Sequence, residues 1–296
     1  MRVFVTGATG FIGSSLVDEL IGAGHQVLGL TRSDEGADAL TGAGAEVHRG
    51  DIYNLDSLRS GAAQSDAVIH LAFNHDFSKF QENCETDRRV IEALASELAG
   101  SDRPLIITSG TGMASAAPGK IATEDDRKAS SKVIPRAASE EAAAAAAAAG
   151  GHVIVVRLPQ VHNTEKQGLV TYAIQVAREK GVSAYIGEGQ NRYPAAHRLD
   201  VARLYRLALE KGTAGATYHA VDEEGVPVKD IAEVIGKGLN VPVVSLTSEE
   251  AQAHFGWLGF FVGLDLAASS TKTRKELDWN PTGPGLITDL ENMRYF

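Results

Sequence analysis

The 296-residue sequence has little cysteine and no long apolar run. Its single cysteine, Cys84, excludes an internal disulfide and any cysteine-rich metal site, and we predict no metal site. No apolar stretch approaches the length of a membrane span. The first residues are predicted to form a core strand, so they cannot double as a removable signal peptide. We therefore expect a cytoplasmic protein without a membrane partner.

Positive charge is also scarce, because 28 lysine and arginine residues stand against 38 acidic residues, for a formal net charge of −10. A surface of this sign repels a phosphate backbone, which argues against a general nucleic-acid partner. A hydrophobic content of 44% with 22% charged residues is ordinary for a globular protein. The partner classes that remain are a small-molecule substrate and a second copy of the chain in a homodimer.

Short segments rich in valine, isoleucine and leucine alternate with longer helical segments through the first half of the chain. The expected strands are Val3–Val5, Gln26–Leu30, Glu46–His48, Ala67–Leu71, Leu105–Thr108 and Val153–Arg157. The expected helices include Phe11–Ala23, Leu55–Ala63, Phe77–Leu98 and the alanine-rich stretch that ends at Gly150. This alternation predicts an α/β fold, a Rossmann-type doubly wound parallel sheet covered by helices.

After residue 158 the regular alternation breaks, although helices are still expected at Val170–Lys180 and Val228–Leu239. We divide the chain into a dinucleotide-binding Rossmann core, at 1–158 with about 191–222, and a smaller C-terminal substrate lobe, at 159–190 and 223–296. The aromatic segment Phe255–Phe261 is interpreted as core or lid packing, with a substrate contact as the alternative. The polar stretch Ser115–Ser131 is the best candidate for a mobile loop.

A glycine-rich turn stands between the first strand and the first helix, with the sequence Thr-Gly-Ala-Thr-Gly-Phe-Ile-Gly. Gly7 permits a tight turn, Gly10 lets the backbone approach a pyrophosphate, and Gly13 allows close packing of helix on strand. The predicted cofactor contacts in this turn are Thr6, Gly7, Gly10, Phe11, Ile12 and Gly13. A glycine triplet in a mid-chain loop would be a plain turn, but between a strand and a helix it predicts a dinucleotide site.

The end of the second strand bears on the choice between NAD and NADP. An NAD site places an acidic residue here to bind the ribose 2′-hydroxyl. In this chain the first charged residue is Arg32, followed by Ser33, and a cation with a hydroxyl group suits a 2′-phosphate. We predict NADP as the cofactor, with NAD as the alternative, because Asp34 could turn back toward the ribose.

In these features the chain resembles the extended and atypical short-chain dehydrogenase/reductase family, from residue 1 to about residue 290. The matching stretches are Thr6–Gly13, Gly50–Ile52, Val68–Ala72, Ile107–Ser109, Val156–Pro159, His197–Ala202 and Ser270–Thr282. The resemblance implies further cofactor contacts at Asp51, Ile52, Leu71, Ala72, Pro159 and Val161. Two of these have simpler interpretations, since Asp51 could cap a helix and Pro159 could end a strand.

The chain lacks the Tyr-x-x-x-Lys motif with which this family usually transfers a proton. One helical turn would place both residues on one face, where the ammonium lowers the pKa of the phenol. None of the seven tyrosines is followed four positions later by lysine. Arg136 and Glu140 stand at the matching place, and neither can replace the missing pair. An i,i+4 ion pair between them is the favoured interpretation.

A different acid must therefore act if the usual carbonyl chemistry occurs. The candidate catalytic residues are Ser109, His162, Tyr193 and His197. Further candidates are His75 and Asp76 after the fourth strand, together with Lys120 and Lys132. Histidine is the side chain whose ordinary pKa suits proton transfer at neutral pH, although a structural role is common for any single histidine.

Three functions agree with these observations. The first is an NADP-dependent oxidoreductase that reduces a small organic molecule by hydride transfer without the Tyr-Lys pair. The second is a non-catalytic NADP-binding sensor, for which loss of the pair is expected. The third is an epimerase or dehydratase that retains its cofactor, although such reactions need a base to remove a hydroxyl proton.

Overall fold

The computed structural model describes residues 1–114, 119–126 and 129–295. A seven-stranded parallel sheet forms its larger part, with the strand order β10-β6-β5-β4-β1-β2-β3. The strands are β1 (Arg2–Thr6), β2 (Gln26–Thr31), β3 (Glu46–Arg49), β4 (Ala67–His70), β5 (Leu105–Gly110), β6 (Val153–Leu158) and β10 (Thr217–His219). The chain order reverses between β1 and β4, which is where an open α/β sheet forms its ligand crevice.

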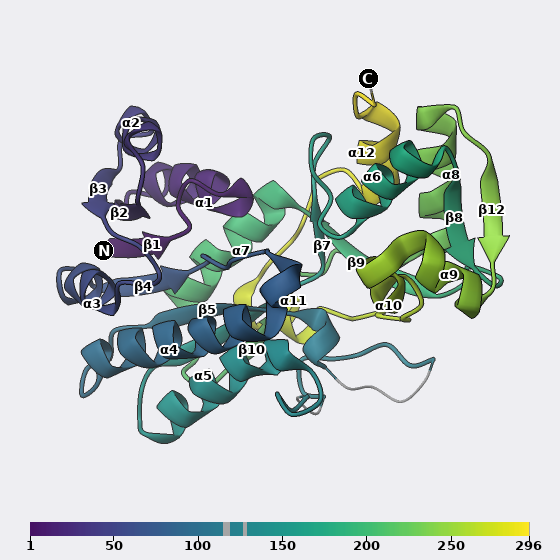
Figure 1. Ribbon diagram of the computed structural model, residues 1–296. Coiled ribbons are helices and arrows are strands. Elements are labelled where there is room, and N and C mark those ends of the chain that lie inside the picture. The colour runs from purple at the N-terminus through teal and green to yellow at the C-terminus, as the bar shows by residue number, and fades with distance from the viewer. Residues whose placement is uncertain (115–118, 127–128, 296) are drawn as a thin grey trace.

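Helices cover both faces of this sheet (Figure 1). One face carries α1 (Phe11–Gly22), α2 (Asp34–Gly42), α7 (Arg198–Lys211) and α11 (Thr271–Leu277), and the other carries α3 (Leu55–Ala63), α4 (Phe80–Leu98) and α5 (Ala138–Ala148). The predicted strands and helices of the first half are thus confirmed, and so is the Rossmann-type fold. The glycine after α5 also has the predicted role, because Gly150 has a φ of 91° and donates to the Ala147 carbonyl.

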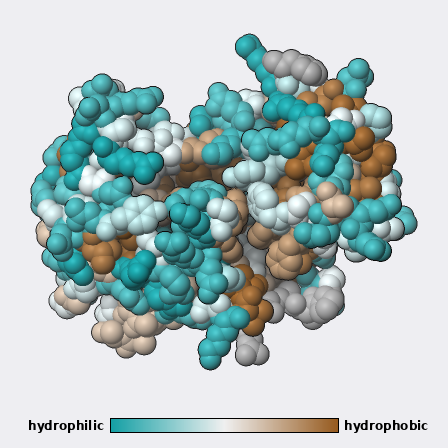
Figure 2. Space-filling model, in the orientation of Figure 1, coloured by the Kyte–Doolittle hydropathy of each residue, from teal (hydrophilic) through white to brown (hydrophobic). Residues whose placement is uncertain are grey.

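The C-terminal lobe lies beyond the carboxyl ends of the sheet strands (Figure 1). It contains a three-stranded sheet of β7 (Gln160–His162), β9 (Arg192–His197) and β11 (Glu223–Pro227), and a two-stranded sheet of β8 (Ser183–Ile186) and β12 (Val243–Leu246). The strand β9 thus pairs outside the seven-stranded sheet, although the predicted core included about 191–222. Its helices are α6 (Val170–Lys180), α8 (Val228–Leu239), α9 (Ser248–Phe255), α10 (Gly259–Val262) and α12 (Leu286–Asn292). The molecular surface is hollowed between the lobe and the α1–α2 side of the core (Figure 2).

Two further predictions concern the surface and the environment of the chain. The predicted mobile loop, Ser115–Ser131, falls partly outside the described residues, and within its described part Ala122 pairs with Ala268. Across the described ranges, no helix is long and apolar enough to span a membrane.

Candidate cofactor and substrate site

The glycine turn has the tight geometry that its spacing predicts. Gly7 has a φ of 67°, and a Cβ atom there would lie 2.8 Å from the Ala72 nitrogen at the end of β4. A Cβ on Gly13 would lie 2.0 Å from the Gly7 carbonyl oxygen. At Gly10, among the described residues, an added Cβ would meet the Gly7 oxygen at 3.1 Å, a tight contact but a single one. The turn therefore needs glycine at its two ends for packing, and Gly10 is the least crowded of its three glycines.

The start of α1 offers hydrogen-bond donors and lies beside two cations. No side chain caps α1 at Gly10, so its first-turn N–H groups are available to an anion. The Lys166 Nζ lies 5.9 Å from the centre of the Phe11 ring, and the Arg198 guanidinium carbon lies 5.5 Å from it. Neither cation forms an ion pair with a residue that the structure describes. Helix dipole and side-chain charge thus favour a diphosphate at this position.

The end of β2 presents Arg32 as an exposed cation. Ser33 caps α2 by accepting a hydrogen bond from the Gly36 N–H at 3.1 Å. Asp34, the residue that could have served an NAD ribose, forms an ion pair with Arg49 at 2.5 Å. Because both members of this pair are exposed, it holds Asp34 only weakly.

A buried chain of hydrogen bonds runs from the glycine turn toward α5. The Thr6 hydroxyl lies 2.6 Å from His70 Nδ1, and His70 Nε2 lies 2.9 Å from Asp87 Oδ1. Burial disfavours the charge on Asp87, but the Arg136 guanidinium and the His70 and Ser139 hydrogen bonds hold the pKa of this carboxyl well below its usual range. Because the ionised Asp87 can only accept, His70 Nε2 donates the hydrogen bond to it.

Arg136 ends this chain at the edge of the sheet that faces the lobe. It donates to Asp87 at 2.7 Å, to the Ser139 hydroxyl, and to the Thr108 carbonyl at 2.9 Å on β5. Its guanidinium lies 4.3 Å from the centre of the Phe73 ring. These contacts fix a permanent cation where β5 ends.

The predicted ion pair between Arg136 and Glu140 is wrong. Arg136 pairs with Asp87, and Glu140 instead accepts two hydrogen bonds from Arg157 on β6, each at 2.9 Å. Both Glu140 and Arg157 are buried. The i,i+4 rule requires both residues on one α-helix, whereas Arg136 lies in the 3-10 turn Pro135–Ala137 before α5, and the two side chains meet different buried partners.

The Asp87–Arg136 network went unnoticed in the sequence, and so did Lys166 and Arg198. The one available signal was an acidic residue, Asp87, on the buried side of an amphipathic helix, which requires a partner. Its partner lies 49 positions further along the chain, and no local spacing indicates it.

The model of the NAD dependent epimerase/dehydratase family matches residues 3–222 of this sequence. The chain belongs to this family. This match confirms the resemblance to extended short-chain dehydrogenases, and membership of a family of NAD-dependent epimerases and dehydratases confirms the predicted enzyme class.

Several proteins are similar to this family member over most or all of its length. It is 50% identical to the uncharacterized protein C2A9.02 of Schizosaccharomyces pombe over 100% of both chains. It is 25% identical to a sterol-4-alpha-carboxylate 3-dehydrogenase, decarboxylating, of Dictyostelium discoideum, covering 76% of this chain and 72% of that one. The structure of UDP-glucuronic acid 4-epimerase from Bacillus cereus, in complex with UDP-glucuronic acid and NAD, matches with a TM-score of 0.76 and 20% identity, over 100% and 98% of the two chains. This last likeness shows the shared fold.

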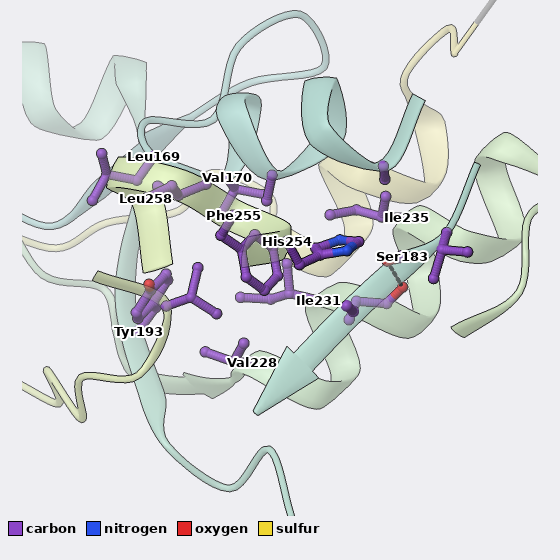
Figure 3. A pocket seen from close by; sticks show the side chains of 16 residues that line it. Leu169, Val170, Ser183, Tyr193, Val228, Ile231, Ile235, His254, Phe255 and Leu258 are labelled. Carbon is purple, nitrogen blue, oxygen red and sulfur yellow. Dashed lines mark hydrogen bonds between the residues drawn. The ribbon is translucent and has the colours of Figure 1, made fainter. Parts of the chain in front are cut away.

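The four predicted catalytic residues of this family member do not form one cluster. The Ser109 hydroxyl donates to Glu140 at 2.6 Å inside the buried pair. Tyr193 donates to the Phe261 carbonyl and lines a small cavity inside the lobe (Figure 3). His162 and His197 do lie together, with ring centres 5.9 Å apart.

The two histidines differ in exposure. His162 is fully buried, its Nδ1 lies 2.6 Å from Asp289, and its Nε2 has no hydrogen-bond partner among the described residues. His197 keeps part of its surface and caps α7 by accepting from the Leu199 N–H. Of these four predicted side chains, His197 is the one that combines a titratable imidazole with partial exposure to solvent.

The other predicted positions lie at different places in the structure. Leu71 and Ala72 follow β4 beside the glycine turn, where Ala72 donates to the Thr6 hydroxyl. Asp51 accepts from the Tyr53 N–H, and Asn54 rather than Asp51 caps α3. Of the remaining predicted positions, Ile52 and Pro159 are partly buried, Val161 is packed into the core, and Lys120 and Lys132 are exposed.

Proposed function

We propose that this family member is an NADP-dependent reductase of the atypical short-chain type, which acts on a small organic substrate without the usual Tyr-Lys pair. The observation that supports this most directly is that the glycine turn and the fixed Arg136 guanidinium share the sheet edge that faces the lobe. A bound NADPH supplies a hydride, and reduction of a carbonyl needs one proton in addition.

The residues present fit this cofactor. The start of α1 would hold the diphosphate, with Lys166 and Arg198 beside it. Arg32 would hold the 2′-phosphate. Asp51 follows β3 at the same edge, as a contact for the adenosine half requires.

Arg136 would act on the substrate as a fixed positive charge. Its contacts with Asp87 and Thr108 orient the guanidinium before any substrate arrives. A preorganised cation stabilises the negative charge that develops on a carbonyl oxygen during hydride transfer. Arginine stays protonated at neutral pH, so the proton must come from another group.

His75 is the side chain that we propose as the proton donor. Its ring centre lies 5.2 Å from that of Phe73, the ring that Arg136 covers. Although His75 is solvent-exposed, desolvation of its imidazole by the neighbouring side chains, with the positive charges of Arg136 and Lys166, lowers the pKa of His75 below its ordinary value. His75 is therefore a stronger acid than a free histidine, and both His75 and Arg136 contact the Phe73 ring, so we propose that they share one substrate oxygen.

This assignment predicts how reduction depends on pH. With NADPH and a panel of aldehydes, ketones, enones and imines, we expect substrate-dependent oxidation of NADPH whose kcat falls as pH rises through the lowered pKa of His75. The protonated fraction of His75 decreases over that range, and proton transfer decreases with it. His75→Gln should lower kcat by about 100-fold and remove this pH dependence.

A matched control is His152→Gln, because His152 precedes β6 at the opposite edge of the sheet. It should leave kcat and its pH profile unchanged. Tight binding of NADPH with no turnover on the whole panel would contradict the reductase and favour the sensor. An unchanged pH profile in His75→Gln would contradict the proton-donor assignment alone.

The preference for NADP rests on Arg32 and is tested separately. In Arg32→Glu, the new carboxylate repels the 2′-phosphate and can accept hydrogen bonds from a free ribose. We expect the ratio of kcat/KM for NADPH to that for NADH to fall by at least about 30-fold. Lys237→Glu on α8 makes the same charge change on an exposed residue of the lobe, and it should leave the ratio unchanged. An equal change in both variants would show a general charge effect instead.

A further inference from the structure

Six aromatic side chains connect the core to the lobe, and we name them the aromatic bridge. They are Phe73, Phe77 and Phe80 of the core and Tyr172, Trp257 and Phe261 of the lobe. At its centre the ring of Phe77 stacks on that of Trp257, with ring centres 4.3 Å apart and planes inclined by 15°. Tyr172 meets both rings edge-on, at 5.7 Å and 5.2 Å. Aromatic surface therefore crosses from the core to the lobe without a break.

The bridge begins beside the cofactor site. Phe73 directly follows Ala72, whose backbone packs against the glycine turn. From Phe73 the ring contacts continue to Phe80 at 6.4 Å and from Phe80 to Phe77 at 5.7 Å. The polar side chains near this end of the bridge are His75 and Arg136, at 5.2 Å and 4.3 Å from the Phe73 ring. The bridge thus joins a polar end near the cofactor to an apolar end at the lobe.

The cavity inside the lobe is too small for a substrate. This cavity, bordered by Tyr193, Phe255 and Leu258, measures about 20 Å³ (Figure 3). That volume accommodates about one water molecule. Trp257, in contrast, is 45% exposed, although large aromatic side chains usually bury most of their surface. A ligand near the cofactor would therefore find ring surface on the bridge, whereas this lobe cavity is too small to hold it.

We propose that the aromatic bridge binds the substrate, and that the substrate is a planar apolar carbonyl compound, such as an aromatic or conjugated aldehyde or ketone. This inference rests on the proposed reductase function. Flat conjugated molecules stack on aromatic faces, and this gain adds to the burial of their apolar area. A sugar ring would bury several hydroxyl groups against the same faces without hydrogen-bond partners. The carbonyl oxygen of a planar ligand would lie at the polar end, toward His75 and Arg136.

The test compares a planar with a compact substrate in variants of Trp257. With trans-cinnamaldehyde, Trp257→Ala should raise KM by at least about tenfold, and Trp257→Phe, which keeps a ring, by less than about threefold. With propanal, both variants should keep KM within about twofold of the parent value. Phe260→Ala is the matched control, because Phe260 is 64% exposed and its nearest ring partner is Phe261 at 5.3 Å. It should change neither KM.

Binding without turnover separates the two proposals. Trans-cinnamyl alcohol cannot be reduced further, and its affinity for the NADPH-loaded protein can be measured by calorimetry beside that of UDP-glucose. Tighter binding of the alcohol, weakened in Trp257→Ala and restored in Trp257→Phe, supports the substrate class even if no aldehyde is turned over. Tighter binding of UDP-glucose, or equal affinity of the alcohol for the parent protein and for Trp257→Ala, would overturn the proposed substrate class. Neither result would contradict the reductase function, which the substrate panel with NADPH tests separately. Melting curves confirm that each variant is folded.

Discussion

Gly13→Ala should abolish dinucleotide binding, lowering the affinity for NADPH by more than about 100-fold. The added Cβ would lie 2.0 Å from the Gly7 carbonyl oxygen. That atom belongs to the backbone of the turn itself, so α1 must move away from β1 to relieve the overlap. Such a movement displaces the N–H groups that meet the diphosphate. The measurement is NADPH affinity by calorimetry, together with the melting temperature.

The same helix supplies the control. Nothing lies within 4 Å of a Cβ added at Gly22, and alanine is the better helix former, so Gly22→Ala should bind NADPH normally and unfold at the same or a slightly higher temperature. If Gly13→Ala fails to fold, Gly10→Val still tests the site. Gly10 has a φ of −79°, which any residue adopts, and a Cβ there would make one tight contact, 3.1 Å from the Gly7 oxygen, with the valine side chain at the start of α1 where we expect the diphosphate. Normal affinity in Gly10→Val would contradict the assignment of this turn as the cofactor cradle.

Much of the fold could be predicted from the sequence, because its signals are local. The run Val153–Arg157 predicts a buried strand, and β6 extends it by one residue. The helix predicted at Val170–Lys180 has the observed bounds of α6. The strands β7, β9 and β11 were missed, since they are held by pairing between distant segments. Their residues include Gln160, Arg192 and Pro227, which do not favour strands on their own.

In the candidate site, too, the features formed by consecutive residues could be predicted, and those formed by distant segments could not. Glycine spacing identifies the turn, because a phosphate cradle is built from consecutive residues. The partners of Arg136 could not be deduced, because Asp87 and Thr108 reach it through the packing of α4 and β5. Arg157, a charge within an apolar strand, does indicate a buried partner. The sequence alone does not identify which of the 38 acidic residues fills that place.

Arg157→Met should destabilise the fold by about 3–5 kcal/mol, because it leaves Glu140 as a buried carboxylate without its guanidinium. In the parent, both oxygens of Glu140 accept from Arg157 at 2.9 Å, and the two side chains are 2% and 0% exposed. Methionine can fill much of the space of the arginine stem but cannot donate a hydrogen bond. Urea unfolding followed by circular dichroism measures the change in the free energy of unfolding.

The double variant Glu140→Leu with Arg157→Met shows whether the cost of Arg157→Met comes from loss of the ion pair itself or from a carboxylate left buried without its guanidinium. If the cost of the single change arises from a buried carboxylate that has lost its guanidinium, removal of both charges should recover at least about 2 kcal/mol of it. Arg59→Met, which breaks the exposed pair with Asp56, should cost less than about 1 kcal/mol. A double variant no more stable than Arg157→Met would mean that the hydrogen bonds of Arg157 to Glu140 and His219 are themselves the stabilising element. In that case the buried charge on Glu140 would account for little of the lost stability. The hydrogen bonds to Glu140, including the one that Ser109 donates, would then stabilise this network more than the neutralisation of its charge does.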